Sequence, residues 1–325
     1  MEQHHDVDVP FELIADVWRN GGVVPFIGSA ASFVGAPTDA RLPDGRMLAN
    51  ELARINKYPG EPSDPLTKVA QYVQDKSGDR DWLLTKVAQW FDQDLECGKL
   101  ANPYVCALTV FLEAVAASLP PLIITTNYDT VIERALERLA VATPDVRYVA
   151  FSHVMPGSGC STQKLLYYTR LADEPQFLVK DKVDQRFRNG DFKDHIIIYK
   201  MHGTSRFSGA PSRADSIVMT EGDYINFLAS DQLNRVPNAI MKVLRSARFL
   251  FLGYALEDWN FRVLLQRLRS FQGSGQRHWA CRIIDETKPD GRIERSFWDK
   301  RNVELYNTDL GGFLTGLAAE ITRLK

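Results

Sequence analysis

The sequence predicts an α/β protein with a Rossmann-like, doubly wound and mostly parallel sheet. Apolar runs of strand length alternate with longer segments of helical spacing along the 325 residues. Four of these runs end in small or polar residues, as strands do at the ligand-binding edge of such sheets. Hydrophobic residues make up 45% and charged residues 25%, which are ordinary globular values. We expect one domain over 1–325, with a helical insertion at about 46–119 and an irregular insertion at about 140–195.

The first elements are a short amphipathic helix at 10–20 and a buried strand at 23–27. Gly21-Gly22 ends the helix. The apolar strand leads directly into a loop of small residues at 28–32. Helical patterns then follow at 46–57, 64–76, 80–94 and 103–118.

The second half of the chain repeats the alternation of strands and helices. Strong strands are expected at 122–126, 195–200 and 248–252, and weaker ones near 147–151, 279–284 and 302–306. Helices are expected at 130–139, 221–230, 236–246, 258–270 and 311–324.

Charge and cysteine usage exclude several function classes. A formal charge of −2 gives no basic surface for nucleic acid. The cysteines at 97, 106, 160 and 281 form no C-x-x-C pair, which argues against a zinc ribbon and a disulfide framework. The polar first residues differ from a signal peptide, and no apolar run approaches a membrane span of about 20 residues. We therefore expect a cytoplasmic protein that needs no metal.

The loop Gly28-Ser29-Ala30-Ala31-Ser32 has the size profile of a phosphate-binding turn. Small side chains let backbone N–H groups approach a pyrophosphate. The loop does not match G-x-G-x-x-G, and a tight strand–helix turn explains it equally well in isolation.

Polar groups concentrate in Thr125-Thr126-Asn127-Tyr128-Asp129, directly after an apolar strand. Asp129 is suited to be the N-cap of the next helix. Asn127 is harder to explain by structure alone, because an amide at a strand end can hold a ribose hydroxyl, a carboxamide or a water.

His202 and Gly203 follow another apolar strand. A histidine here can be a core residue bonded to backbone, or a general base near neutral pH.

The fourth strand ends in Gly253-Tyr254-Ala255, where Gly253 permits close backbone approach. Beyond it, Asp258 is expected to cap a helix, and Trp259 and Phe261 to pack rather than stack on a ligand.

In this order, the four segments resemble the sirtuin-like family, and especially its bacterial antiphage-defence NADase branch. The resemblance extends over residues 20–320 in pattern, and its motifs cover about 30 residues. It implies that Gly28, Ser29, Ala30 and Ser32 bind the phosphates of NAD, with Ala30 where glycine is usual. It implies that Thr126 and Asp129 contact the nicotinamide ribose, with Thr126 in place of glutamine. The remaining implied NAD contacts are Gly203, Gly253, Tyr254 and Ala255.

The implied reaction is hydrolysis of the nicotinamide–ribose bond, with Asn127 and His202 as catalytic residues and NAD as substrate. Branch members act by depleting NAD, and the resemblance implies gating by homo-oligomerisation, a regulatory protein partner or a further domain.

One departure distinguishes the chain from protein deacylases of the family. The paired C-x-x-C zinc module expected between Asn127 and His202 is missing. This absence counts against an NAD-dependent protein deacylase, which is kept as an alternative, as is a non-catalytic module that senses NAD or ADP-ribose.

Overall fold

The computed structural model describes residues 8–38, 41–96, 104–155, 164–207, 216–229, 236–254, 266 and 276–323. A nine-stranded sheet in the order β5-β4-β3-β6-β2-β1-β7-β8-β9 forms its centre. The strands are β1 (Val23–Ile27), β2 (Leu122–Thr125), β3 (Tyr148–His153), β4 (Lys164–Tyr168), β5 (Gln176–Val179), β6 (Ile196–Lys200), β7 (Arg248–Leu252), β8 (His278–Cys281) and β9 (Val303–Tyr306).

Every pairing from β3 to β9 is parallel, whereas β4 and β5 are antiparallel. The predicted α/β class with a mostly parallel sheet is therefore confirmed. Helices surround it: α1 (Phe11–Arg19), α2 (Gly45–Asn56), α3 (Leu66–Ser77), α4 (Arg80–Glu96), α5 (Ala107–Ala114), α6 (Val131–Ala142), α7 (Lys180–Asn189), α8 (Glu221–Ala229), α9 (Asn238–Ser246), α11 (Pro289–Asp299) and α12 (Leu310–Arg323).

The sheet separates two hydrophobic cores because alternate residues of each strand face opposite sides. In β1, Val23 and Ile27 join the core that contains the apolar faces of α1, α5, α6 and α12. Val24 and Phe26 face the second core, which includes side chains of α7, α9 and α11.

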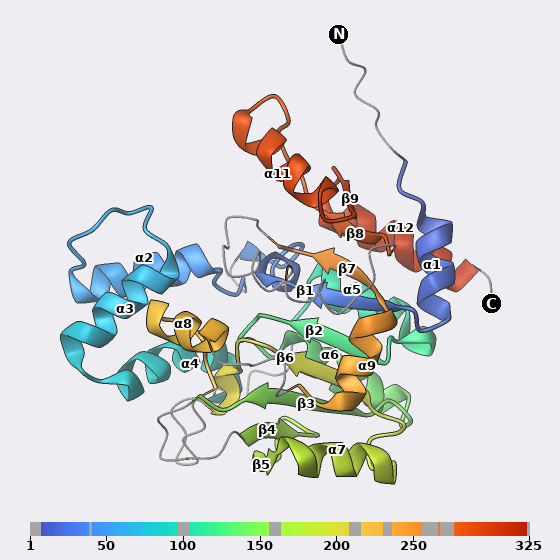
Figure 1. Ribbon diagram of the computed structural model, residues 1–325, viewed down its shortest axis with the longest axis horizontal. Coiled ribbons are helices and arrows are strands. Elements are labelled where there is room, and N and C mark those ends of the chain that lie inside the picture. Colours follow the sequence, from blue (N-terminus) through green and yellow to red (C-terminus); the bar gives the residue numbers. More distant parts are fainter. Residues whose placement is uncertain are drawn as a thin grey trace.

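A third core joins the helices α2, α3 and α4. Figure 1 shows these helices and α8 gathered beyond the arrowheads of β1, β2 and β6. Tyr128, Ile217 and Met219 belong to this third core. It therefore packs directly on loops that follow the strands.

Residues 140–195 differ from the expected irregular insertion. They form β3, β4, β5 and α7, and the three strands extend the central sheet. The sequence pattern missed β4, although it is a short buried apolar run paired on both sides, and it missed β5 at the edge of the sheet. In β5, three of the four residues are exposed, so apolar periodicity is absent. The pattern also missed α11, whereas the helix expected at 258–270 lies outside the described residues except for 266.

No helix in the described ranges is both long and apolar enough to cross a membrane.

Candidate functional site

The four segments singled out in the sequence meet at one edge of the sheet. Ile27 of β1 pairs with Thr125 of β2 and with Leu252 of β7, while Thr125 also pairs with Lys200 of β6. Gly28, Thr126 and Gly253 therefore each follow a paired residue at the same level. Asn127 and His202 each lie two residues beyond the pair Thr125–Lys200. The parallel register thus brings both expected catalytic residues to the carboxyl ends of adjacent strands.

The loop at 28–32 is a turn of 3-10 helix, Ser29–Ser32, preceded by Gly28 in extended conformation. Its amides are partly used within the protein. Gly28 N–H donates to the Leu252 carbonyl at 2.8 Å, and Ala30 N–H donates to the Gly253 carbonyl at 3.2 Å. Ala31 N–H donates back to Gly28 at 3.1 Å. These three hydrogen bonds fix the shape of the loop. Each of these amides could donate to a pyrophosphate only after its hydrogen bond to a backbone carbonyl is broken.

Gly28 and Gly253 are needed for contact between two loops. A methyl group on Gly253 would lie 2.4 Å from the Ala31 nitrogen, and one on Gly28 would lie 2.5 Å from the Gly253 oxygen. Gly253 also has φ of +74°, which side chains rarely adopt. The close backbone approach expected at Gly253 is therefore made by the 28–32 loop of the protein itself.

Tyr254 ties the end of β7 to the ends of β1 and β2. Its hydroxyl donates to the Ile27 carbonyl at 3.1 Å and lies 2.9 Å from Oγ1 of Thr126. Two residues expected to contact NAD are therefore bonded to each other. The third residue of this segment, Ala255, lies outside the described residues, as do Asp258, Trp259 and Phe261.

Asn127 is buried and its amide group has a fixed orientation. Nδ2 donates to the Gly28 carbonyl at 3.1 Å and to Oγ of Ser32 at 2.8 Å. A backbone carbonyl can only accept, so the nitrogen must face Gly28 and the amide oxygen must face away. Thr125 completes the setting, because its hydroxyl accepts from the Asn127 N–H at 3.0 Å. The side chain is thus bound to the very loop expected to hold phosphates.

Asp129 holds the start of α6. Its Oδ1 accepts from the Val131 N–H at 3.0 Å, although Thr130 occupies the N-cap position. Asp129 therefore accepts from the first helical residue, as expected of a cap, but it lies one residue before the N-cap position. Burial raises the pKa of the carboxyl, while the charge of Lys200, the Val131 amide and a hydrogen bond with Ser32 oppose the rise.

His202 is buried against aromatic side chains of α8. Its ring lies edge-on to Tyr224 and Phe227, with centroids 5.2 and 5.6 Å away. Nδ1 is 3.4 Å from the Tyr224 hydroxyl, and the His202 carbonyl accepts from the Val218 N–H at 3.0 Å. Gly203 has φ of +91°, and a methyl group there would lie 2.0 Å from the Ser216 oxygen. The His-Gly pair therefore needs glycine for its backbone path.

A buried ion pair beneath the two loops was not anticipated from the sequence. Lys200 Nζ lies 3.0 Å from Oε1 of Glu133, and both side chains are at most 1% exposed. The Tyr168 hydroxyl donates to Glu133 Oε1 at 2.6 Å. Burial raises the pKa of Tyr168 well above its ordinary value, the Glu133 charge adds to this, and a hydrogen bond with Thr204 opposes it. The available signal was a lysine ending an otherwise apolar strand.

The helices beyond the sheet edge are anchored to the His202 side of the site. Arg80 at the start of α4 forms an ion pair with Asp223 of α8 at 3.0 Å and donates to the Ile217 carbonyl at 2.9 Å. The Tyr128 hydroxyl donates to the Val218 carbonyl at 2.7 Å. These contacts hold α8, which carries the aromatic neighbours of His202.

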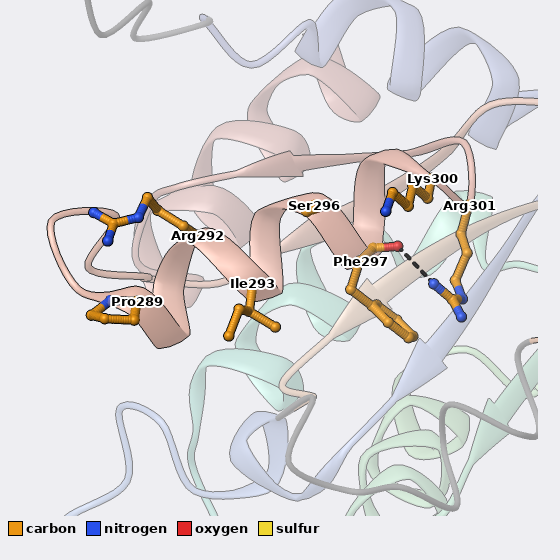
Figure 2. Close-up of a pocket in the computed structure, with 7 residues that line it drawn as sticks. All are labelled: Pro289, Arg292, Ile293, Ser296, Phe297, Lys300 and Arg301. Atoms are coloured by element: carbon orange, nitrogen blue, oxygen red, sulfur yellow. Dashed lines mark hydrogen bonds between the residues drawn. The ribbon is translucent and has the colours of Figure 1, made fainter.

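A surface hollow of about 490 Å³ lies elsewhere, along α11. Figure 2 shows its lining side chains, including three basic ones and the ring of Phe297. Arg301 donates to the Phe297 carbonyl at 3.1 Å and lies over that ring. None of the lining residues belongs to the four strand-end segments.

Comparison with known proteins identifies relatives of this arrangement. A SIR2-like domain matches residues 121–306, from the strand before Asn127 to the end of β9. The chain is 30% identical over 190 residues to the NAD(+) hydrolase ThsA of Bacillus cereus (strain MSX-D12), covering 58% of this chain and 31% of that protein. It is also 30% identical over 119 residues to the NAD(+) hydrolase ThsA of Cytobacillus dafuensis, covering 35% of this chain and 22% of that protein.

The chain thus spans less than a third of the length of either relative. The matched range contains Asn127, His202 and Gly253, whereas the Gly28–Ser32 loop precedes it. The family match therefore covers more than half of the chain, and it includes the strands that precede three of the four segments. The chain therefore belongs to the SIR2-like domain family.

Proposed function

We propose that this protein is an NAD⁺ glycohydrolase that cleaves the nicotinamide–ribose bond to give nicotinamide and ADP-ribose. The observation that carries the proposal is the equal register of Asn127 and His202 at the carboxyl ends of β2 and β6. At this edge an amide oxygen can accept from a ribose hydroxyl or a water, and an imidazole can act as a general base near neutral pH. The names of both relatives, which are NAD(+) hydrolases, support the same activity.

Asn127 is proposed to orient the ribose and the attacking water. Its nitrogen is committed to Gly28 and Ser32, and no donor in the described part of the chain bonds to its amide oxygen. That oxygen can therefore accept a hydrogen bond from a ribose hydroxyl or from water. Because the amide is clamped, the acceptor is held in place before substrate binds, which lowers the entropic cost of alignment.

His202 is proposed as the general base. The C1′–nitrogen bond breaks and its electron pair leaves with nicotinamide, through an oxocarbenium-like state. The water oxygen bonds to C1′, and its proton passes to the imidazole. In the tautomer proposed for the reaction, Nδ1–H donates to the Tyr224 oxygen, so Nε2 carries the lone pair and takes the proton.

The remaining strand ends are proposed to bind the rest of NAD. The 28–32 loop approaches the pyrophosphate, and exposed Ser29 is its accessible member. Thr126 and Asp129 adjoin the nicotinamide ribose, Gly203 lies beside His202, and the Gly253–Ala255 segment lines the adenosine side.

An enzyme that destroys NAD must be restrained in its host cell. We propose that this chain is a gated effector of bacterial antiphage defence, restrained by self-assembly, a regulatory protein partner or a further domain.

The test is NAD⁺ turnover followed by product chromatography, at several protein concentrations and without peptide. Wild type is compared with Asn127→Ala and His202→Ala. Matched controls are His195→Ala, at the opposite end of β6, and Asn307→Ala, which follows β9 and bonds the Ile284 backbone. We expect nicotinamide and ADP-ribose from wild type and both controls, and a loss of at least 100-fold in the two site variants.

Other results would redirect the assignment. Nicotinamide release that needs an acyl-lysine peptide would indicate a deacylase. NAD binding unaltered by Asn127→Ala, with no turnover at any protein concentration or after addition of a genomic-neighbour partner protein, would indicate a sensing module and reject the hydrolase.

A further inference from the structure

We propose that the buried ion pair of Lys200 and Glu133 positions the Asn127 and His202 segments relative to each other for reaction. This inference rests on the proposed NAD⁺ hydrolysis and names two positioning residues for it. Lys200 is the last residue of β6 and Glu133 belongs to α6, so neither lies in the loops that form the site. Neither is among the residues expected from the sequence to contact NAD.

Lys200 reaches from one segment to the other. It ends β6, two residues before His202, and its Nζ donates to the Asp129 carbonyl at 2.5 Å. Asp129 lies two residues after Asn127. The lysine side chain therefore spans the gap between the loops on the His202 side and the Asn127 side.

Ser205 makes a second bridge on the other side of His202. Its N–H and its hydroxyl both donate to the Tyr128 carbonyl, at 2.9 and 3.0 Å. Two successive carbonyls, those of Tyr128 and Asp129, thus accept from residues that flank His202 in the sequence. The two bridges clamp the His202 segment to the Asn127 segment at both ends.

Glu133 sets the position of the lysine. It lies in the first turn of α6, where its Oε1 meets Nζ of Lys200 and the hydroxyl of Tyr168. Because Oε1 of Glu133 contacts the ammonium group of Lys200, that group is held in position to donate to the Asp129 carbonyl. The helix that begins after the Asn127 segment therefore also fixes the cation that grips that segment.

Stability alone does not explain the pair. Removing two charges from water costs free energy, and a well-packed apolar pair of similar volume often folds equally well or better. What an apolar pair cannot supply is a directional donor to the Asp129 carbonyl. The role of the ion pair is therefore to position the segments of the site.

The main test is the double variant Lys200→Met with Glu133→Leu, which removes both charges together. The variant leaves the Asp129 carbonyl and the Tyr168 hydroxyl without these partners, so we expect a lower urea unfolding midpoint. Below the unfolding transition, kcat for NAD⁺ falls at least tenfold and KM changes less than threefold. Lys180→Met is the matched control, because it breaks the remote Lys180–Asp184 pair of α7, 3.1 Å apart, and should leave kcat unchanged.

Amide hydrogen exchange supplies a readout that is independent of turnover. In the double variant, the Ser205 and Val131 amides should exchange at least tenfold faster, whereas amides of α12 should keep their protection. If wild-type protein does not hydrolyse NAD⁺ at any concentration or with a genomic-neighbour partner protein, the proposed function fails, and the exchange rates still decide whether the pair holds the two segments.

Tyr168→Phe is a milder variant for the case in which the double variant does not fold. It removes one bond to Glu133 and the hydrogen bond with Thr204 of the His202 segment, so kcat should fall about threefold with faster exchange at Ser205. A folded double variant, or failing that a folded Tyr168→Phe, with wild-type kcat and wild-type exchange would overturn the proposal.

Discussion

Gly253→Ala tests whether the loops at the ends of β1 and β7 require close backbone contact. Gly253 has φ of +74°, and a methyl group there would lie 2.4 Å from the Ala31 nitrogen and 3.0 Å from its Cβ. Both neighbours belong to the main chain or its first side-chain atom, so neither can rotate away. The substitution must displace the 28–32 loop, which also carries the Ser32 acceptor of Asn127.

The expected cost has two parts. Placing a non-glycine residue at positive φ costs about 1–2 kcal/mol. Overpacking against fixed neighbours adds roughly 1–3 kcal/mol. Gly190→Ala isolates the first part, because Gly190 has φ of +84° at the end of α7 and nothing within 4 Å of the added methyl. We therefore expect a loss of roughly 2–5 kcal/mol for Gly253→Ala and about 1–2 kcal/mol for Gly190→Ala.

Urea unfolding of the two variants and wild type gives these losses as shifts in midpoint at constant slope. Turnover of NAD⁺ below the unfolding transition provides the functional readout, and only Gly253→Ala should reduce it. Equal losses of stability in the two variants would refute the steric argument. Full turnover by Gly253→Ala would show that the loop contact does not shape the site.

Three further results are expected. Tyr224→Phe removes the hydroxyl 3.4 Å from Nδ1 of His202, so kcat should fall roughly 2- to 10-fold at constant KM, as for one lost hydrogen bond; unchanged kcat in steady-state kinetics would count against ring fixation. Asp129→Asn keeps the capping acceptor. Because the folded pKa of Asp129 is raised, its contribution to stability is full below about 3.8 and is lost as pH rises through the folded value. The unfolding free energy of wild type should therefore fall relative to the variant between pH 4 and 7, by about 1.4 kcal/mol per pKa unit, and a constant difference would contradict this. Burial raises the pKa of Cys106, and that of Cys281 to about 12, so both peptides should be alkylated at least tenfold faster in urea than in native protein, as followed by mass spectrometry; equal rates would contradict the burial.

Much of the sheet was predictable because its central strands are buried on both faces. Such strands appear as continuous apolar runs, and 23–27 and 248–252 match β1 and β7 residue for residue. The positions of Asn127 and His202 followed from the same pattern. A residue that ends an apolar run in a parallel sheet must lie at its carboxyl edge, so sequence order alone placed them there.

The partners of these residues were decided by tertiary structure. Asn127 bonds to Ser32, and Lys200 bonds to Asp129 and Glu133, across chain separations that no local pattern encodes. Lys200 ends an otherwise apolar run in the sequence, and the run does not reveal that Glu133 of α6 pairs with it in the buried interior. Likewise, Gly28 and Gly253 looked like ligand-approach glycines, although each is required by the other's loop.

The sequence by itself determined the fold class, the central strands and the edge at which the site lies, because burial leaves a periodic apolar trace in the chain. Tertiary structure alone decided the antiparallel strands β4 and β5, the setting of His202 against α8, and the ion pair that bridges the two loops. These features depend on hydrogen bonds and charge pairs between distant segments. Such interactions become favourable only after the surrounding core has excluded water, so they leave no periodic signal in the sequence.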